Sequence, residues 1–297
     1  MSQPTHSPKP NFFIVGAPKC GTTAMYEYLK QHPDIFMPVV KEPRFFGARP
    51  ETRRFKTEQD YLQLFKGVQH EKRIGEASPS YLRAPRAAAE IQAFCPDAKI
   101  IVMLRSPVDL IHSAFFQSKA SGTEEQETLE EALARSHSAE TLRDGKTPRP
   151  NYLSYAHFVE PLKRYFDIFG RENVHVIIFD DLKENTPEVY RQTLAFLEVD
   201  PSFQPEFAVV NAAKQVRSPA LQRILIALGL TPMQVKYSRL GKAAAIIPAP
   251  LREHALKMLR AAYTVEKRPP PMGAELRHQL QQAFLLQAKK SSGKKGR

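Results

Sequence analysis

Residues 12–23 read FFIVGAPKCGTT, and this stretch decides the fold. Phe12–Val15 is short, apolar and rich in strand-favouring residues, whereas the segment after the second glycine, TTAMYEYLKQ, has helical periodicity and ends before Pro33. When a strand enters a helix through a glycine-bounded loop, the N–H groups of the loop and of the helix N-terminus point into one pocket. The sequence therefore predicts a phosphate- or sulfate-binding loop over residues 16–23.

The position of the lysine distinguishes this loop from that of the nucleotide triphosphatases. The spacing Gly16-x-x-x-x-Gly21 equals that of GxxxxGK[ST], but Thr22 follows the second glycine and the lysine lies inside the loop as Lys19. A lysine after the second glycine reaches β- and γ-phosphates beside magnesium. A lysine inside the loop can instead reach an oxygen that bridges two acidic groups. The loop by itself is also compatible with an ordinary tight turn.

A second strand-to-helix junction lies near residue 100. Lys99–Leu104 has the pattern of a buried strand, and Ser106 and Pro107 are typical of a helix cap and first turn. Arg105 is then expected at the carboxyl end of the strand and Ser113 about two turns into the helix. An arginine and a serine so placed can together bind a second phosphate group.

These segments together resemble the sulfotransferase family that uses 3′-phosphoadenosine 5′-phosphosulfate (PAPS), especially its bacterial and carbohydrate-type branches. The resemblance covers roughly residues 11–200 and includes two further blocks, KEPRFFG at 41–47 and GEASPSYL at 75–82. It implies that PAPS is the cofactor, 3′-phosphoadenosine 5′-phosphate (PAP) the product, and that no metal is needed. It also implies an EC 2.8.2 type transfer of a sulfuryl group to a hydroxyl of a carbohydrate or another aliphatic alcohol.

The resemblance assigns roles to individual residues. Lys19 is expected to stabilise the departing phosphate, and Glu42, placed before a Phe-Phe pair as in carbohydrate sulfotransferases, is expected to act as general base. The expected cofactor-binding residues are Pro18, Lys19, Cys20, Gly21, Thr22, Thr23, Arg105, Ser113 and Phe179, with Arg217, Lys267 and Arg268 as cations that could close the site. The expected substrate-binding residues are Lys41, Arg44, Phe45, Glu76, Ser78 and Tyr81.

Ordinary structural roles compete with several of these assignments. Thr22 and Thr23 could cap the helix, and Phe179 could belong to the core at a strand end. The chain also departs from the family, because many relatives have a lysine directly after the glutamate of GEASPSYL, where this chain has Ala77. Either Lys19 acts alone or Lys41 or Arg44 takes that role; the C-terminal part also lacks the family's usual closing segment.

The composition points to an anionic partner. The 297 residues carry a formal net charge of +12, yet no basic stripe with interleaved aromatic residues or other nucleic-acid signature is visible. The two cysteines, Cys20 and Cys95, show no disulfide framework, which favours a reducing compartment. The polar, proline-rich N-terminus resembles no signal peptide and no stretch predicts a membrane span, so we expect a soluble, cytoplasmic protein. The oligomeric state cannot be read from the sequence.

The alternation of strand and helix patterns predicts an α/β fold with a P-loop-like parallel sheet, helices on both faces and a mostly helical C-terminal third. Strands are expected at 12–16, 72–76, 99–104 and 173–179, and helices at 22–31, 58–66, 85–94, 107–120, 127–139, 152–168, 186–198, 218–229, 250–262 and 273–288. No strand is expected after Pro201. Residues 11–288 are expected to form a single domain between a disordered N-terminus (1–10) and a disordered basic tail (289–297).

Three functions follow from these observations. The first is PAPS-dependent sulfuryl transfer. The second is a P-loop-type nucleotide kinase or NTPase, which the position of Lys19 disfavours. The third is a catalytically inactive nucleotide-binding protein, an interpretation that Ala77 favours.

Overall fold

The computed structural model describes residues 8–48, 53–136, 151–208, 214–216 and 264–293, together with single positions between 218 and 262. The chain divides into two compact units. Unit 1 comprises Met1–Arg105 and His157–Asn211, and unit 2 comprises Ser106–Ala156 and Ala212–Arg297. The expectation of a single domain over residues 11–288 stays a prediction, and no change of composition marks the boundary between the two units.

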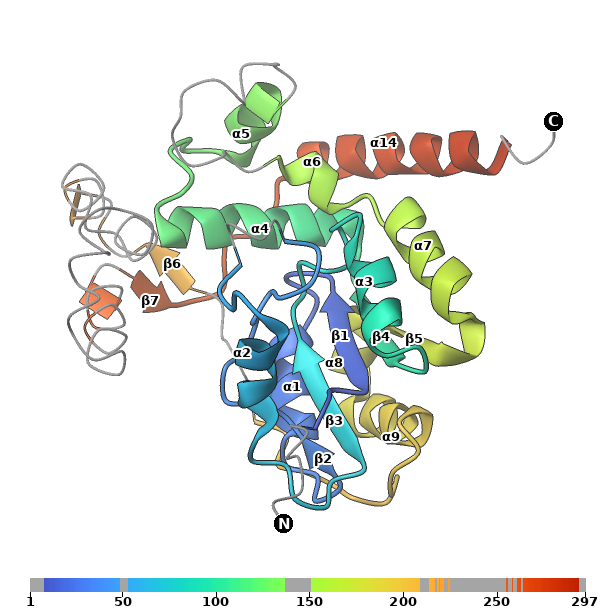
Figure 1. Ribbon diagram of the computed structural model, residues 1–297. Coiled ribbons are helices and arrows are strands. Elements are labelled where there is room, and N and C mark those ends of the chain that lie inside the picture. Colours follow the sequence, from blue (N-terminus) through green and yellow to red (C-terminus); the bar gives the residue numbers. More distant parts are fainter. Residues whose placement is uncertain are drawn as a thin grey trace, which may run out of the picture. The chain divides into compact units, whose positions relative to one another are not determined.

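The core of unit 1 is a parallel β-sheet with the strand order β2-β3-β1-β4-β5 (Figure 1). Its strands are β1 (Phe12–Gly16), β2 (Ile35–Phe36), β3 (Arg73–Ala77), β4 (Lys99–Leu104) and β5 (Val174–Ile178). All five residues of β1 are buried, as expected for a central strand that is covered on both faces. The parallel α/β sheet and its four longer strands are confirmed. The two-residue β2 has no sequence pattern long enough to predict it.

Helices cover both faces of this sheet. They are α1 (Thr22–Leu29), α2 (Glu58–Leu62), α3 (Ala87–Phe94), α7 (Val159–Phe169), α8 (Phe179–Glu184) and α9 (Thr186–Phe196), with 3₁₀ turns at Gln63–Phe65 and Arg171–Asn173. Helices α3 and α7 lie on one face, and α1, α8 and α9 lie on the other (Figure 1). The rings of Tyr28 and Tyr190 join α1 to α9 with their centroids 6.5 Å apart.

Unit 2 contains α4 (Pro107–Ser121), α5 (Leu129–Ser136), α6 (Tyr152–Tyr155), β6 (Lys214–Val216), β7 (Thr264–Glu266) and α14 (Ala274–Gly293). Strands β6 and β7 pair antiparallel, so the expectation of no strand after Pro201 is wrong. The helix expected over 152–168 is two helices, α6 and α7. The helices expected at 218–229 and 250–262 lie outside the described residues, apart from single positions. Helix α14 extends into the predicted disordered tail.

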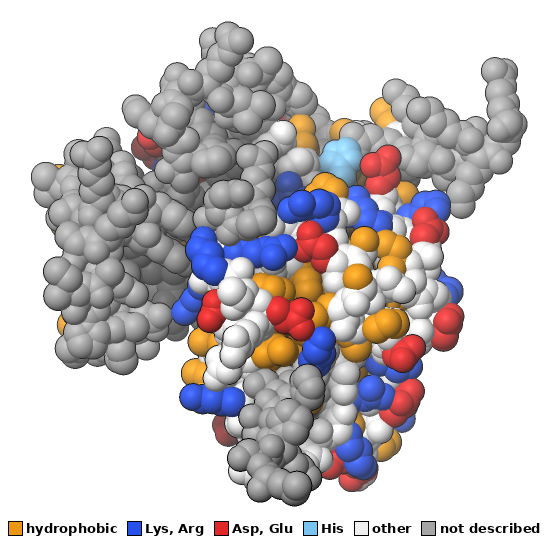
Figure 2. Space-filling model, viewed as in Figure 1, with side chains coloured by type: hydrophobic (Ala, Val, Ile, Leu, Met, Phe, Trp, Pro, Cys, Tyr) orange, Lys and Arg blue, Asp and Glu red, His pale blue; other side chains and the backbone are white. Residues whose placement is uncertain are grey.

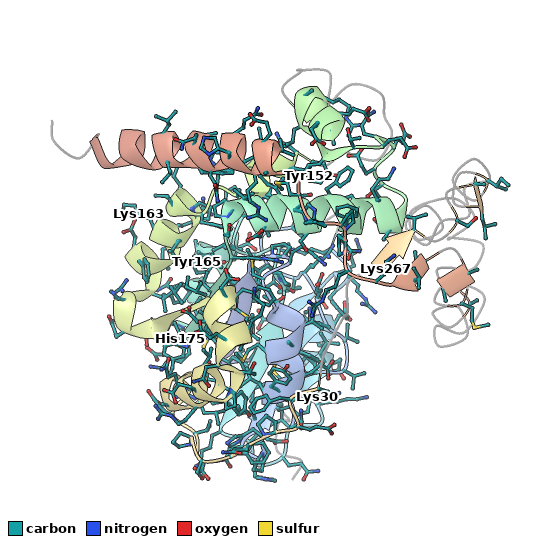
Figure 3. All side chains as sticks on the ribbon, turned by 180° about the vertical axis from the view of Figure 1, so that it is seen from behind. Lys30, Tyr152, Lys163, Tyr165, His175 and Lys267 are labelled. Carbon is teal, nitrogen blue, oxygen red and sulfur yellow. The ribbon has the colours of Figure 1, made fainter. Side chains whose placement is uncertain are left out.

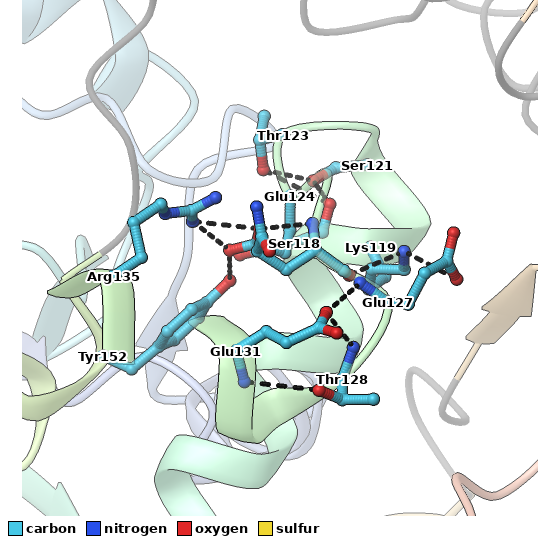
Figure 4. Close-up of polar contacts among 11 residues, drawn as sticks. Ser118, Lys119, Ser121, Thr123, Glu124, Glu127, Thr128, Glu131, Arg135 and Tyr152 are labelled. Atoms are coloured by element: carbon cyan, nitrogen blue, oxygen red, sulfur yellow. Dashed lines mark hydrogen bonds and ion pairs between the residues drawn. The ribbon is translucent and has the colours of Figure 1, made fainter. Parts of the chain in front are cut away.

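A buried carboxylate holds the first segment of unit 2 together (Figure 4). Glu124 is 3% exposed and accepts two hydrogen bonds from Arg135, at 2.9 and 2.8 Å. Its oxygens also accept hydrogen bonds from the Tyr152 hydroxyl and the Gln126 amide, both at 2.8 Å. Because every partner donates, the buried charge is compensated, and it links α5 and α6 to the loop after α4.

Candidate functional site

The glycine loop joins β1 to α1 as predicted. Gly21 occupies the N-cap position with a φ of 85°, and α1 begins at Thr22 without a side-chain cap. The threonines therefore do not cap this helix, and its first N–H groups are available to an anion. A Cβ atom at Gly21 would lie 2.7 Å from Cδ2 of Phe179, so the close approach requires glycine.

Cys20 lies buried inside the loop. Burial raises the pKa of its thiol to about 12, although the charge of Arg105 opposes the shift. The thiol therefore stays protonated at neutral pH, and Cys20 is not a reactive thiolate. Lys19 precedes it with a φ of 67°, in the left-handed region.

Arg105 and Phe179 lie against the same loop. The Arg105 guanidinium lies over the Phe179 ring, 5.0 Å from the ring centroid, and Lys183 Nζ lies 5.4 Å from the same centroid. Phe179 opens α8 instead of ending the strand, so the predicted strand end is wrong by one residue. Nε of Arg105 is buried and has no hydrogen-bond partner in the described part of the chain. A buried donor of this kind indicates an acceptor that the described residues do not supply.

Glu42 carries a carboxylate with a cation on each oxygen. Lys41 Nζ lies 3.2 Å from Oε1, and the Arg44 guanidinium donates to Oε2. Burial alone would raise the pKa of Glu42, but the charges and hydrogen bonds of Lys41 and Arg44 hold it below its ordinary value. Glu42 is therefore ionised at neutral pH, with a side chain that is 33% exposed. Lys41 and Arg44, predicted to bind substrate, both contact Glu42.

Backbone hydrogen bonds attach the Glu42 segment to the end of β3. The Glu42 amide donates to the Ala77 carbonyl and the Arg44 amide donates to Ser78 Oγ, both at 3.1 Å. The Ser78 amide in turn donates to the Ile14 carbonyl of β1 at 3.1 Å. Glu42 is thereby held at the carboxyl edge of the sheet, where β1 enters the glycine loop. Acidic and basic side chains are interspersed over the coloured face that Figure 2 shows.

Four residues predicted to bind substrate are buried: Phe45, Glu76, Ser78 and Tyr81. Phe45 is 6% exposed and its ring stacks on that of Tyr61, with centroids 4.4 Å apart. These side chains take part in the packing and hydrogen bonding beneath Glu42, and their role in substrate binding stays a prediction. Ala77, where relatives have a lysine, is also buried.

Glu76 is the most buried carboxylate of this region. Its Oε2 accepts hydrogen bonds from the hydroxyl groups of Tyr61 at 2.6 Å and Tyr81 at 3.0 Å, whereas Oε1 has no partner among the described residues. Burial raises the pKa of Glu76 to about 7, although hydrogen bonds from neighbouring hydroxyl groups oppose the shift. Sequence reasoning missed Tyr61. The sequence places Tyr61 on the apolar face of a helical pattern, but this pattern does not indicate that its hydroxyl bonds to Glu76.

The remaining predicted cofactor residues lie in unit 2 or outside the described residues. Ser113 lies on α4, and the predicted cap Ser106 occupies the N-cap position without a side-chain hydrogen bond. Lys267 and Arg268 follow β7 and are exposed (Figure 3 labels Lys267). Arg217 is not among the described residues. Because Arg105 and Ser113 belong to different units, their joint role stays a prediction.

The arrangement of the described residues also bears on metal binding and on membrane-spanning helices. Among them, no group of three or more His, Cys, Asp or Glu side chains is arranged to hold a metal ion. Asp180, whose position after β5 suggests a magnesium ligand, forms an ion pair with Lys183 at 2.6 Å. No helix within the described ranges has the length and apolar character to cross a membrane.

Comparison with known proteins identifies relatives. Residues 9–219 match the family described as "Sulfotransferase domain". A crystal structure of a sulfotransferase from Alicyclobacillus acidocaldarius is 35% identical, with a TM-score of 0.62, and the match covers 77% of this chain and 95% of that one.

Curated animal enzymes match over shorter shares of their own length. Carbohydrate sulfotransferase 15 of Mus musculus is 27% identical over 270 residues, which covers 71% of this chain and 48% of the relative. Heparan sulfate glucosamine 3-O-sulfotransferase 3A1 of the same species is 31% identical over 159 residues, 54% of this chain and 39% of the relative. The chain thus spans about half the length of the first of these relatives and a smaller share of the second.

Proposed function

We propose, from the premise that this chain belongs to the sulfotransferase domain family, that it transfers a sulfuryl group from PAPS to a hydroxyl group of a carbohydrate. The observation that carries the proposal is the ionised carboxylate of Glu42, which is held at the sheet edge where the glycine loop begins. This arrangement offers a proton acceptor beside an anion-binding loop. The acceptor class is supported by the names of two relatives, carbohydrate sulfotransferase 15 and heparan sulfate glucosamine 3-O-sulfotransferase 3A1.

The residues present fit an anionic nucleotide donor. The first turn of α1 has no side-chain cap, so its N–H groups can donate to the 5′-phosphosulfate. The buried Nε of Arg105 lacks an acceptor among the described residues, and a phosphate oxygen would supply one. We propose that Arg105 and Ser113 hold the 3′-phosphate and that Gly21, Thr22 and Thr23 hold the 5′-phosphate.

The donor supplies the sulfuryl group, and the residues of the chain prepare the acceptor and the leaving group. The acceptor oxygen forms a bond to sulfur while Glu42 takes its proton. The bond from sulfur to the bridging oxygen breaks, and Lys19 stabilises the charge that develops on the phosphate. Lys41 and Arg44 keep Glu42 ionised, so no separate step is needed to prepare the base.

Calorimetry and turnover assays test this proposal. We expect the protein to bind PAP far more tightly than adenosine 5′-phosphate, and to transfer ³⁵S from labelled PAPS to desulfated heparan or chondroitin with EDTA present. Tight binding of ATP with magnesium and none of PAP would indicate a kinase or NTPase. Binding of PAP without transfer to any carbohydrate or simple alcohol would indicate a catalytically inactive nucleotide-binding protein.

A cytoplasmic location remains part of the proposal. It is supported by the free thiols of Cys20 and Cys95, which are compatible with a reducing compartment. Fractionation of the host cell with an antibody against the chain would test it, and recovery from a secretory or outer compartment would contradict it.

A further inference from the structure

One hydroxyl group connects the buried carboxylate of Glu76 to the backbone that carries Glu42. Tyr81 Oη accepts hydrogen bonds from the amides of Phe45 at 2.8 Å and Phe46 at 3.2 Å. The same oxygen donates its proton to Glu76 Oε2 at 3.0 Å. Both amides are donors, so the hydroxyl must donate to Glu76 Oε2, an oxygen that also accepts from Tyr61 and can accept whether or not the carboxyl group is ionised. Its lone pairs are then aimed at the two amides.

The amides of Phe45 and Phe46 and the Tyr81 hydroxyl lie in buried surroundings. Tyr61, Glu76 and Tyr81 are each 0% exposed, and Phe45 and Phe46 are 6% and 5% exposed. Water is therefore excluded from the two amides, and among the described residues Tyr81 Oη is the acceptor that satisfies them. A buried N–H group without an acceptor is unfavourable, so the conformation of residues 45 and 46 depends on this oxygen.

The backbone just before these amides is in an uncommon conformation. Glu42 has a φ of 55° and Arg44 a φ of 54°, and residues other than glycine keep such values only where their surroundings determine them. The surroundings here are the hydrogen bonds to Ala77, Ser78 and Tyr81. The Glu42 side chain is 33% exposed and its carboxylate contacts Lys41 and Arg44 of the same segment, so its direction follows from the conformation of this backbone.

We propose that Tyr81, oriented by Glu76, is a positioning residue: its hydroxyl sets the conformation of residues 42–46 and so directs the Glu42 carboxylate toward the acceptor. Tyr81 contacts neither donor nor acceptor and acts through the backbone amides alone. The role of Glu42 in this inference rests on the proposed function. The effect of Tyr81 on the conformation of residues 42–46 rests only on its hydrogen bonds. The proposal gives Glu76 and Tyr81, which are buried, a role that requires no contact with the substrate.

The test removes this hydroxyl and compares it with a matched removal nearby. Tyr81→Phe deletes Oη, whereas Tyr165→Phe deletes a hydroxyl that donates to the Tyr81 carbonyl at 3.1 Å. Tyr165 is also 0% exposed and projects from α7 in the same unit (Figure 3). Both variants lose one buried tyrosine hydroxyl, so both lose similar thermal stability, and only Tyr81→Phe releases the amides of Phe45 and Phe46.

Two measurements are made on each variant. Loss of an acceptor worth about 1–2 kcal/mol corresponds to a factor of roughly 5–30, so amide exchange in a peptide spanning 41–47 is expected to accelerate by that factor in Tyr81→Phe only. Turnover with ³⁵S-labelled PAPS and desulfated heparan is expected to fall by a similar factor in Tyr81→Phe, with the Kd for PAP unchanged. Tyr165→Phe is expected to match the wild type in both measurements.

Each other outcome has a definite meaning. Equal exchange in the two variants overturns the proposal, and so does faster exchange in Tyr81→Phe without loss of turnover. A weaker Kd for PAP in Tyr81→Phe would show a general distortion of the loop and would also overturn it. A wild-type protein without transferase activity contradicts the proposed function, while the exchange result still decides whether Tyr81 holds the segment.

Discussion

The guanidinium of Arg105 lies on one ring, that of Phe179, which also lies against the glycine loop at Gly21. Phe179 therefore connects the end of β4 to the loop that follows β1. An aromatic face attracts a cation, and at partly desolvated sites this contributes about 0.5–2 kcal/mol. The ring keeps Arg105 in place before any nucleotide arrives.

Replacement of this ring by an aliphatic side chain should weaken nucleotide binding. Phe179→Leu keeps apolar bulk but removes the cation–π contact, so we expect the Kd for PAP to rise by roughly 2- to 30-fold. Isothermal titration measures the change. Phe166→Leu is the matched control, because Arg171 lies over the Phe166 ring at the same 5.0 Å, away from the loop. An unchanged Kd in Phe179→Leu would show that the ring does not position Arg105.

Glu42 and Lys19 should fail in different ways. Glu42→Gln removes the proton acceptor, and loss of a general base lowers turnover by about 10²–10⁴-fold while the Kd for PAP stays nearly constant. Lys19→Ala should lower turnover and weaken PAPS binding together, because in the proposed reaction the same ammonium contacts the donor before and during transfer. Steady-state kinetics with calorimetry separate the two patterns. Near-normal turnover in Glu42→Gln would assign the base to another residue.

The pH dependence of turnover should report the cations around Glu42. The proposed reaction needs ionised Glu42, so we expect the rate to fall as the pH drops through its pKa, which is held below the ordinary 4.5. Removal of the Arg44 guanidinium raises the pKa, so Arg44→Ala should move the acid limb of kcat/KM to higher pH. Arg86→Ala, which removes an exposed arginine paired with Glu90, is the control for net charge. A limb at the same pH in both variants would contradict the coupling.

The stability of the protein should show the raised pKa of Glu76. This carboxyl group is protonated in the folded protein up to about pH 7 but ionises near 4.5 in the unfolded chain. The unfolded state then binds fewer protons between these values, so stability falls as the pH rises through this window. Glu76→Gln cannot ionise and should reduce that fall.

Thermal unfolding at a series of pH values measures the effect. The control is Glu58→Gln, which changes a glutamate on α2 of the same unit with a half-exposed side chain. Wild-type and Glu76→Gln proteins with parallel pH profiles would contradict a neutral Glu76 in the folded state.

The parallel sheet and the glycine loop were predictable because their signals are local. β1 and β4 contain the apolar runs Phe12–Val15 and Ile100–Leu104, β5 is apolar except for His175, and Gly16 and Gly21 mark the loop by their spacing alone. β6 and β7 were missed because two three-residue strands far apart in sequence pair through backbone atoms that no residue pattern records. No linker precedes Ser106, so no local signal in the sequence marks the boundary between the two units.

The sequence selects candidate site residues but does not indicate their contacts. Glu42 could be selected by its place before Phe45, yet the sequence does not indicate that Lys41 and Arg44 both contact its carboxylate or that Glu42 and Arg44 have left-handed backbone. The burial of Tyr81 and its partners, Glu76 and the amides of Phe45 and Phe46, could not be predicted because they depend on the fold. Hydrogen bonds between residues far apart in the sequence cannot be predicted from a single sequence.

The order of segments along the chain has a consequence for synthesis on the ribosome. β4 and β5 are neighbours in the sheet, but the first segment of unit 2 is translated between them. A nascent chain that has released β4 therefore carries an apolar strand with one unpaired edge, which other chains or chaperones can bind. At 5–20 residues per second, synthesis of residues 105–178 leaves that edge open for about 4 to 15 seconds.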